Sequence, residues 1–432
     1  MINIQTLLRR LVTVEADEIK ALLISCLYFF LILCAYYVIR PIRSEMVIAN
    51  GVANIQWLML MTVMVLIAIT PIFGWVTTRF KTRQFLSYCT LFFASNLLIF
   101  FFLFNVEQRS PIVTRAFFIW VNVFNMFIVS LFWSFMNDLY SRSQSKRLFA
   151  FIAAGGTAGA ICGPIITTML VELIGLGYLL LISAIILSIS VLCIVWLTRW
   201  DNRDFNDTSE QYTERNNALE GGVLDAFKLI LKSPYLIGIC LFISLYAVSI
   251  TFVEIHQAEI VARTFDNPTE RTKLFSSIDF SVNLLALIFQ LFITSRIIQW
   301  FGYRAALMLV PVGITIGFGL MATMPILAVM VGVEIFRRSG DYAIMKPARE
   351  MLFSVVTREE KYKAKNFIDT AILRGGNAAS ALAYSGIKAA GASAASVAGI
   401  SLVLGLSWCA TAFWLAGQFN NKTRLNNSEK MQ

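Results

Sequence analysis

The chain has 432 residues, of which 58% are hydrophobic and only 14% are charged, and its mean hydropathy is +0.71. Soluble globular chains carry about 25% charged residues, so this composition excludes a water-soluble domain and indicates a protein that has lipid as its solvent. The basic residues behind the net charge of +10 are spread over short loops, which excludes nucleic acid as the reason for that charge.

Apolar stretches that could cross a bilayer recur from one end of the chain to the other. A helix needs about 20 apolar residues to cross roughly 30 Å of hydrocarbon, and in lipid only helices and closed barrels satisfy their backbone hydrogen bonds. We therefore expect an all-α membrane protein with about twelve transmembrane helices. The predicted spans are 21–44, 53–77, 84–105, 112–136, 148–171, 176–198, 235–257, 275–295, 304–323, 326–352, 367–388 and 395–416.

The longest polar interruption separates two sets of six spans. It runs from Asp201 to Leu219 and has the composition of a solvated linker. The predicted domains are an N-terminal six-helix half at 1–199, a cytoplasmic linker at 200–232, a C-terminal six-helix half at 233–418 and a cytoplasmic tail at 419–432. Short basic turns, each followed by a glycine pair, recur at equivalent places in both halves, at Gly155-Gly156 and Gly375-Gly376. Two halves with parallel repeats are typical of the major facilitator architecture.

Lysine and arginine crowd every second loop. By the positive-inside rule, both termini and the central linker are expected in the cytoplasm. The first twenty residues mix basic and acidic side chains and lead into no small-residue cleavage pattern, so a removed signal peptide is not expected.

Sequence motifs for catalysis and metal binding are missing. The chain has no Gly-rich phosphate loop ending in Gly-Lys-Ser/Thr, no two-histidine zinc motif, and a single histidine, His256. We therefore expect no enzymatic activity, no catalytic residue, no metal and no cofactor. The seven cysteines lie in or beside apolar runs without paired spacing, so we interpret them as small core residues; they are Cys26, Cys34, Cys89, Cys162, Cys193, Cys240 and Cys409.

Small residues predict a close helix contact in the fifth span. Gly155, Gly159 and Gly163 are four residues apart, which places them on one face of a helix. Such a face lets a second helix approach closely, so we interpret this groove as a packing surface.

Ionisable and amide side chains at membrane depth are the positions that say most about function. A charge at the centre of a membrane helix costs about 2.5–3.5 kcal/mol on insertion scales, so each needs a partner or a wet cavity. In chain order they are Arg40, Arg43 and Glu45 around Pro41; Asn122 and Asn125; Glu254, His256 and Gln257; Asp279, Asn283 and Gln290; Glu334, Arg337, Arg338 and Asp341; and Asp369 and Arg374.

Two interpretations of these side chains stay open. They could pair with one another across helices, and the charges of the tenth span nearly cancel. For Arg40, Arg43 and Arg374 a binding role is favoured, because none has an acid at ideal helical spacing on the side facing the centre. We interpret His256 as a hydrogen-bonded polar residue near the outer interface rather than as part of a proton relay.

Four stretches carry a family resemblance. They are Tyr37-Val-Ile-Arg40-Pro-Ile-Arg43-Ser-Glu45-Met46; Phe132-Trp-Ser-Phe-Met-Asn137-Asp138 with Ser145-Lys146-Arg147-Leu-Phe149; Lys346-Pro-Ala-Arg349-Glu350-Met-Leu-Phe353; and Lys361-Tyr-Lys363-Ala-Lys365-Asn-Phe367-Ile-Asp369 with Arg374-Gly375-Gly376. Together they resemble the ATP:ADP antiporter, or nucleotide triphosphate/diphosphate exchange, family in its shorter bacterial branch. The resemblance implies a major facilitator-like fold, alternating access and an anionic solute. The best-known members recognise nucleotides with intramembrane lysines, whereas here the membrane-depth cations are mainly arginines, with Lys346 the exception.

The resulting hypothesis is a secondary active transporter, an antiporter or a proton-coupled symporter, in the bacterial inner membrane. It would move a small anionic solute, with a nucleotide as one candidate, through a cavity between the halves. Guanidinium groups bind phosphate and carboxylate bidentately and stay charged in low dielectric. The predicted solute contacts are Arg40, Arg43, Asn125, Arg337, Arg338 and Arg374. The predicted coupling or gating residues are Glu45, Glu254, His256, Gln257, Asp279, Asn283, Glu334, Asp341 and Asp369.

Two alternatives stay open at this point. In the same class, the solute could be a metal chelate or an organic acid. In another class, the chain could be a non-transporting membrane subunit that binds a protein partner, which predicts fully paired polar side chains and no water-accessible cavity. In either case the expected partners include membrane lipid and exclude nucleic acid, and we expect a monomer.

Overall fold

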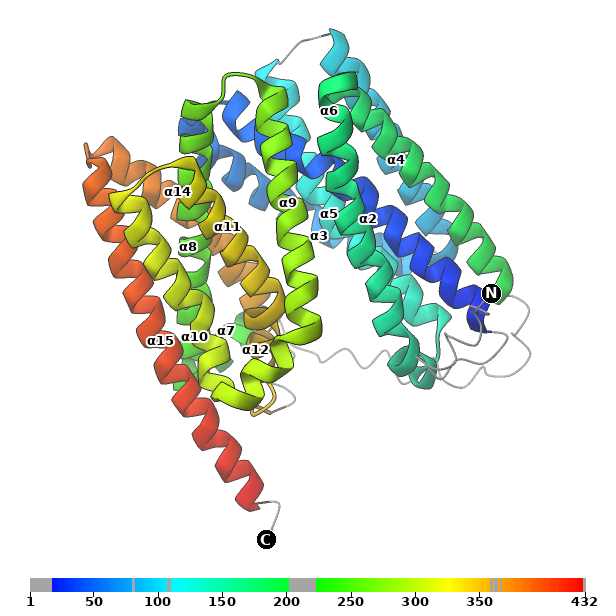
Figure 1. Ribbon diagram of the computed structural model, residues 1–432. Coiled ribbons are helices and arrows are strands. Elements are labelled where there is room, and N and C mark those ends of the chain that lie inside the picture. The colour runs from blue at the N-terminus through cyan, green and yellow to red at the C-terminus, as the bar shows by residue number, and fades with distance from the viewer. Residues whose placement is uncertain are drawn as a thin grey trace. The chain divides into compact units, whose positions relative to one another are not determined.

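The computed structural model describes residues 18–79, 82–106, 110–201, 223–357, 360, 364–365 and 367–429, and all regular structure in them is helical (Figure 1). Residues 202–222 of the linker predicted at 200–232 lie outside the described residues.

Each predicted span of the N-terminal half falls on a helix. These are α2 (Glu18–Ala49), α3 (Ile55–Arg79), α4 (Thr82–Val106), α5 (Pro111–Leu139) and α6 (Arg142–Asp201), with the short 3₁₀ helix η1 (Val52–Asn54) between α2 and α3. Helix α6 contains both the fifth and the sixth predicted spans, because two helices join across a kink at Gly175, where φ is +79°. Glycine adopts this left-handed conformation without a steric cost, so the chain bends there between the two spans.

The C-terminal part begins with the short α7 (Val223–Lys232). It continues with α8 (Pro234–Thr264), α9 (Pro268–Phe292), α10 (Thr294–Thr323), α11 (Leu327–Gly340), the π-helical turn η2 (Asp341–Met345), α12 (Lys346–Leu352), the π-helical turn η3 (Ile368–Ile372), α14 (Leu373–Ala389) and α15 (Ala394–Glu429). Helix α10 has a kink like that of α6, at Gly302 with φ +76°.

Nine helices within the described residues are long and apolar enough to cross a membrane. One of them is α6, which holds two predicted spans. The tenth and eleventh predicted spans are not among the nine, because each is a composite of short helices around a π-helical turn that contains an aspartate, Asp341 or Asp369. An all-α, multi-pass membrane protein is therefore confirmed, whereas the number twelve stays a prediction.

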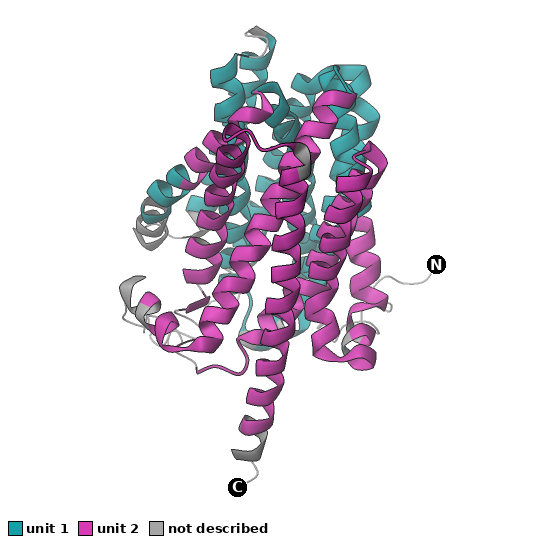
Figure 2. Ribbon diagram, turned by 90° about the vertical axis from the view of Figure 1, so that its left-hand side faces the viewer, with its two compact units in different colours: residues 1–50, 64–210, 265–283 teal, residues 51–63, 211–264, 284–432 magenta. Residues whose placement is uncertain are grey.

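Contacts group the chain into two compact units (Figure 2). Unit 1 comprises residues 1–50, 64–210 and 265–283, and unit 2 comprises residues 51–63, 211–264 and 284–432. Helix α9 is thus divided at Asn283, and its first part packs with the N-terminal helices. The two halves predicted from the sequence differ from these units and stay a prediction.

Within unit 1, the glycine groove of α6 receives α2. A Cβ atom added to Gly159 would collide with the carbonyl oxygen of Phe30, and one added to Gly163 would lie 2.8 Å from the carbonyl oxygen of Cys34. The two backbones are therefore too close for any side chain at these positions. The Thr167 hydroxyl, four residues after Gly163 on the same face of the helix, donates to the carbonyl of Val38 at 3.0 Å. The predicted packing groove is confirmed.

Side chains also replace the backbone hydrogen bonds that two prolines remove. Proline has no N–H, so Pro164 leaves the carbonyl of Ala160 without its helical donor. In unit 1 the Asn283 side chain donates to that carbonyl at 2.9 Å, which ties α9 to α6. In unit 2 Pro347 likewise frees the carbonyl of Ala343, and the Thr294 hydroxyl donates to it at 2.9 Å.

Candidate functional site

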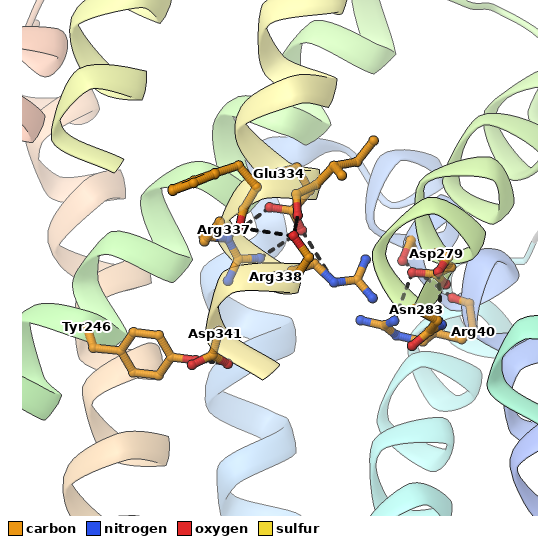
Figure 3. A network of polar contacts seen from close by, with 12 residues as sticks. Arg40, Tyr246, Asp279, Asn283, Glu334, Arg337, Arg338 and Asp341 are labelled. Carbon is orange, nitrogen blue, oxygen red and sulfur yellow. Dashed lines mark hydrogen bonds and ion pairs between the residues drawn. The ribbon is translucent and has the colours of Figure 1, made fainter. Parts of the chain in front are cut away.

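In unit 1, the first candidate cation is held by an acid. Arg40 Nη1 lies 2.8 Å from Asp279 Oδ1, and the Asp279 carboxylate is almost fully buried (Figure 3). The Arg40 guanidinium also lies over the ring of Tyr37, 5.4 Å from its centroid. The buried carboxylate balances much of this positive charge, so the pair ties α2 to the first part of α9.

Arg43, one turn further along α2, has a different environment. Its Nη1 donates to the amide oxygen of Asn122 on α5 at 2.9 Å, and its guanidinium lies 5.6 Å from the centroid of the Phe118 ring. Among the described residues Arg43 forms no ion pair, and its buried Nε atom has no hydrogen-bond acceptor. Arg43 therefore keeps its full charge and has an unused buried donor.

Further along α2, Glu45 faces the beginning of α9. This carboxylate is 1% exposed, and Arg271 Nη1 lies 3.7 Å from its Oε1 atom. The more exposed Lys273 reaches Glu172 of α6 at 2.6 Å. Together with Arg40–Asp279, these pairs hold the first part of α9 against α2 and α6 within unit 1.

In unit 2, α11 carries a buried arginine–glutamate pair. Arg337 donates to both oxygens of Glu334, at 2.9 and 2.7 Å, and both side chains are less than 5% exposed (Figure 3). Arg338 Nε lies 3.9 Å from the same carboxylate. Glu334 and Arg338 are four residues apart and share a helix face, but the close partner of Glu334 is Arg337.

Asp341 begins the π-helical turn η2 and is 8% exposed. Its Oδ2 atom accepts a 2.7 Å hydrogen bond from the Tyr246 hydroxyl of α8 (Figure 3). π-helical turns are rare in proteins, and those that occur are often at functional sites. Asp341 is thus a buried acid held by a hydroxyl, on a segment of irregular backbone.

Arg374, near the beginning of α14, is the second candidate solute contact that has no acid partner among the described residues. It is half-buried, and it forms no hydrogen bond or ion pair within the part of the chain that the structure describes. The next residue, Gly375, has open space where a Cβ atom would be. A solute oxygen could therefore reach the Arg374 guanidinium and the backbone beside it.

The other predicted residues have more ordinary surroundings. His256 Nδ1 lies 3.9 Å from Glu259, which also accepts a hydrogen bond from Tyr384 and pairs with Lys388 at 3.4 Å. Gln257 is buried, Glu254 and Asn125 are half-buried, and Asn283 caps the Ala160 carbonyl. Asp369 lies 3.6 Å from Arg349.

Several partners were not among the residues predicted from the sequence. They are Asn122, Tyr246, Glu259, Arg271 and Arg349. Asn122 and Arg349 had a sequence signal, as an amide at membrane depth and as part of a family-like stretch. Glu259 lies three residues from His256 on the same helix, whereas Tyr246 and Arg271 become partners only when helices pack, because their partners are distant in the sequence. Within the described residues, no group of three or more His, Cys, Asp or Glu side chains could hold a metal ion.

Solved structures with a similar fold are membrane transporters. A bacterial homologue of the iron transporter ferroportin, in an inward-facing state, superposes with a TM-score of 0.66 at 14% identity, covering 93% of this chain and 100% of that one. A nucleoside transporter superposes with a TM-score of 0.55 at 14% identity, covering 95% and 99%. These likenesses establish a major facilitator-like fold.

A relative in sequence is the ADP,ATP carrier protein 1 of Chlamydia muridarum, which is 26% identical over 308 residues. The match covers 63% of this chain and 58% of the relative, so the chain spans little more than half the length of that protein.

A family model covers most of the chain. The model described as TLC ATP/ADP transporter matches residues 116–419, from α5 to α15. This range includes three of the four family-like stretches in full, all but Tyr37–Met46, and all of the buried charges of unit 2. The chain belongs to the TLC ATP/ADP transporter family.

Proposed function

We propose that this protein is a secondary active transporter that moves a small anionic solute across the bacterial inner membrane by alternating access, with adenine nucleotides as the first solutes to test. The observation that carries the proposal is that two membrane-depth arginines, Arg43 and Arg374, have no acid partner among the described residues. The family to which the chain belongs supports the choice of nucleotide.

The sign of these unbalanced charges favours an anion. A buried charge is costly unless an opposite charge or a wet cavity compensates it. Arg40 and Arg337 have carboxylates within 3 Å, whereas Arg43 has an amide and Arg374 has open space next to it. A phosphate or carboxylate of the solute would supply the missing compensation, and guanidinium groups bind both bidentately.

The acid-paired residues would serve gating and coupling. The pairs Arg40–Asp279 and Arg271–Glu45 hold the first part of α9 to α2, so they would have to break wherever α9 moves away during the cycle. Asp341 is a buried carboxylate that accepts a hydrogen bond from Tyr246, which makes it a candidate proton carrier if transport is coupled to protons. Arg337 and Arg338 would act through Glu334 rather than on the solute.

Ligand-induced thermal stabilisation of the purified protein tests the proposal. A ligand that binds only the folded state at 100 times its dissociation constant stabilises it by about 2.7 kcal/mol. ATP, ADP, a phosphorylated sugar, citrate and an iron–citrate chelate should be compared with adenosine at equal ionic strength. Stabilisation by one or more anions but not by adenosine is expected, and stabilisation by the chelate alone would identify the metal-chelate alternative. A protein that responds to none of these anions would contradict the proposal.

A further inference from the structure

We infer that Asn122 determines the charge selectivity of the transporter, by holding Arg43 with a neutral acceptor that leaves the guanidinium its full positive charge. This inference rests on the proposed function. It assigns a positioning role to a residue that the sequence marked only as polar at membrane depth.

Asn122 contacts Arg43 through its amide oxygen. Asn122 Oδ1 accepts from Arg43 Nη1 at 2.9 Å, and Asn122 Nδ2 donates to the carbonyl of Phe118, four residues earlier on α5, at 2.8 Å. The second bond fixes which end of the amide faces Arg43, because only the NH₂ group can donate to a carbonyl. Asn122 thus presents an oxygen to Arg43.

Two other membrane-depth arginines, one on α2 and one on α11, differ from Arg43 in having a carboxylate partner. Arg40, three residues before Arg43 on α2, is held by Asp279, and Arg337 is held by Glu334 through two hydrogen bonds. An aspartate would fit the space of Asn122, since the two side chains differ only in a terminal NH₂ against an oxygen. A neutral amide at this position has two chemical consequences: its NH₂ group donates to the Phe118 carbonyl, which a carboxylate cannot do, and residue 122 does not cancel the charge of Arg43.

Arg43 also has a hydrogen-bond donor, its Nε–H group, for which the described residues supply no acceptor. This Nε atom is buried. A buried polar donor without an acceptor carries a free-energy penalty unless a ligand or water completes it. The Phe118 ring lies 5.6 Å from the guanidinium carbon and holds the guanidinium in place without supplying a formal charge. Arg43 is therefore oriented by two neutral groups and retains donors for the oxygens of an anion.

The test exchanges the charge of residue 122 without changing its shape. ADP binding by the purified protein in detergent is measured for the wild type, Asn122→Asp and Asn122→Ser. In Asn122→Asp the new carboxylate would pair with Arg43, so ADP affinity should fall about ten- to a hundredfold. Asn122→Ser keeps a small neutral acceptor, so its affinity should stay within about threefold of wild type. A purely structural hydrogen bond predicts instead that Asn122→Asp binds ADP as tightly as the wild type does, because aspartate still accepts from Arg43.

Asn105→Asp is the matched control. Asn105 on α4 also donates to the carbonyl four residues earlier, at 3.0 Å, but it is exposed and has no hydrogen bond with an arginine among the described residues. Its change to aspartate should leave ADP affinity unchanged. If Asn122→Asp cannot be purified in folded form, Asn122→Leu removes the acceptor without adding charge, and it should weaken ADP binding while the maximal exchange rate stays near wild type.

The outcomes separate the inference from the proposed function. A wild-type protein that binds neither ADP nor any other anion overturns both. A wild type that binds ADP, together with Asn122→Asp or Asn122→Leu variants of unchanged affinity, overturns the role of Asn122 alone.

Discussion

Arg349 of α12 and Asp369 of η3 form an ion pair, with Arg349 Nη2 3.6 Å from Asp369 Oδ1. An ion pair between Glu350 and Lys365 lies beside it in the sequence. These four residues belong to two of the four stretches that carry the family resemblance, one in the tenth predicted span and one leading into the eleventh. The two stretches therefore form a single structural unit, in which each supplies the partner of the other.

Charge reversal tests this ion pair. Arg349→Asp and Asp369→Arg should each lower the free energy of unfolding by about 1–3 kcal/mol, between the values for exposed and buried pairs, since Asp369 is one-third exposed. The double reversal should recover most of the loss. Thermal denaturation in detergent measures all three, and a double variant no more stable than the weaker single variant would contradict the pairing.

The buried pair Arg337–Glu334 should respond more strongly. Arg337→Gln leaves the Glu334 carboxylate buried without its bidentate partner, which typically costs about 3–5 kcal/mol of stability. Adding Glu334→Gln removes the orphaned charge, so the double variant should be more stable than Arg337→Gln alone. Lys365→Gln is the control, because the side chains of that pair are 32% and 45% exposed and its loss should change stability by less than about 1 kcal/mol.

The α2–α6 contact predicts that Gly159 tolerates no side chain. Gly159→Leu should lower the melting temperature or prevent folding, because overpacking a close contact typically costs about 1–3 kcal/mol or more. Gly399→Leu is the matched control, since Gly399 on α15 is exposed and has open space around its Cα atom. Equal melting temperatures for the two variants would show that the groove does not hold α2.

Much of the fold could be predicted from hydropathy alone. The spans and the Gly155–Gly163 groove follow from local sequence, because apolar length and four-residue spacing act within one helix. The merging of two spans at Gly175, and the π-helical turns at Asp341 and Asp369, were not predicted. These depend on how neighbouring helices satisfy freed backbone groups, as the Thr294 hydroxyl does for Ala343.

The candidate site was less predictable, because its contacts also depend on how the helices pack. Local spacing identified the arginines but not their partners, because Asp279 is 239 residues from Arg40 and Asn122 is 79 residues from Arg43. The sequence favoured a binding role for Arg40, Arg43 and Arg374 alike. The packed helices distinguish Arg40, which has a carboxylate, from the other two, which do not.

Orientation in the membrane is open to a labelling test. In a cysteine-free background, single cysteines replace Asn421, near the end of α15, and Asn267, in the turn before α9, both of which are exposed. With both termini in the cytoplasm, an impermeant thiol reagent added to intact cells should label the cysteine at 267 and not the one at 421. The reverse pattern would contradict the orientation that the basic loops predict.

Arg374→Gln tests the proposed solute contact in unit 2. Removing a charge-assisted hydrogen bond worth roughly 1.5–3 kcal/mol should weaken the affinity for the transported anion about ten- to a hundredfold. Stability should be unchanged, because Arg374 forms no ion pair within the described residues. Binding and melting temperature are measured on the same preparation. A large loss of stability with affinity intact would assign Arg374 a structural role instead.

The central claim, exchange of an anionic solute, is tested most directly by counterflow in proteoliposomes. Vesicles containing the purified protein are preloaded with unlabelled ADP and diluted into a trace of labelled ATP, with protein-free and empty vesicles as controls. We expect label to accumulate transiently above equilibrium in the preloaded vesicles only, and preloaded Arg374→Gln vesicles to require a higher ATP concentration. If neither nucleotides, phosphorylated metabolites nor organic acids produce counterflow in protein that is correctly folded, the account is contradicted.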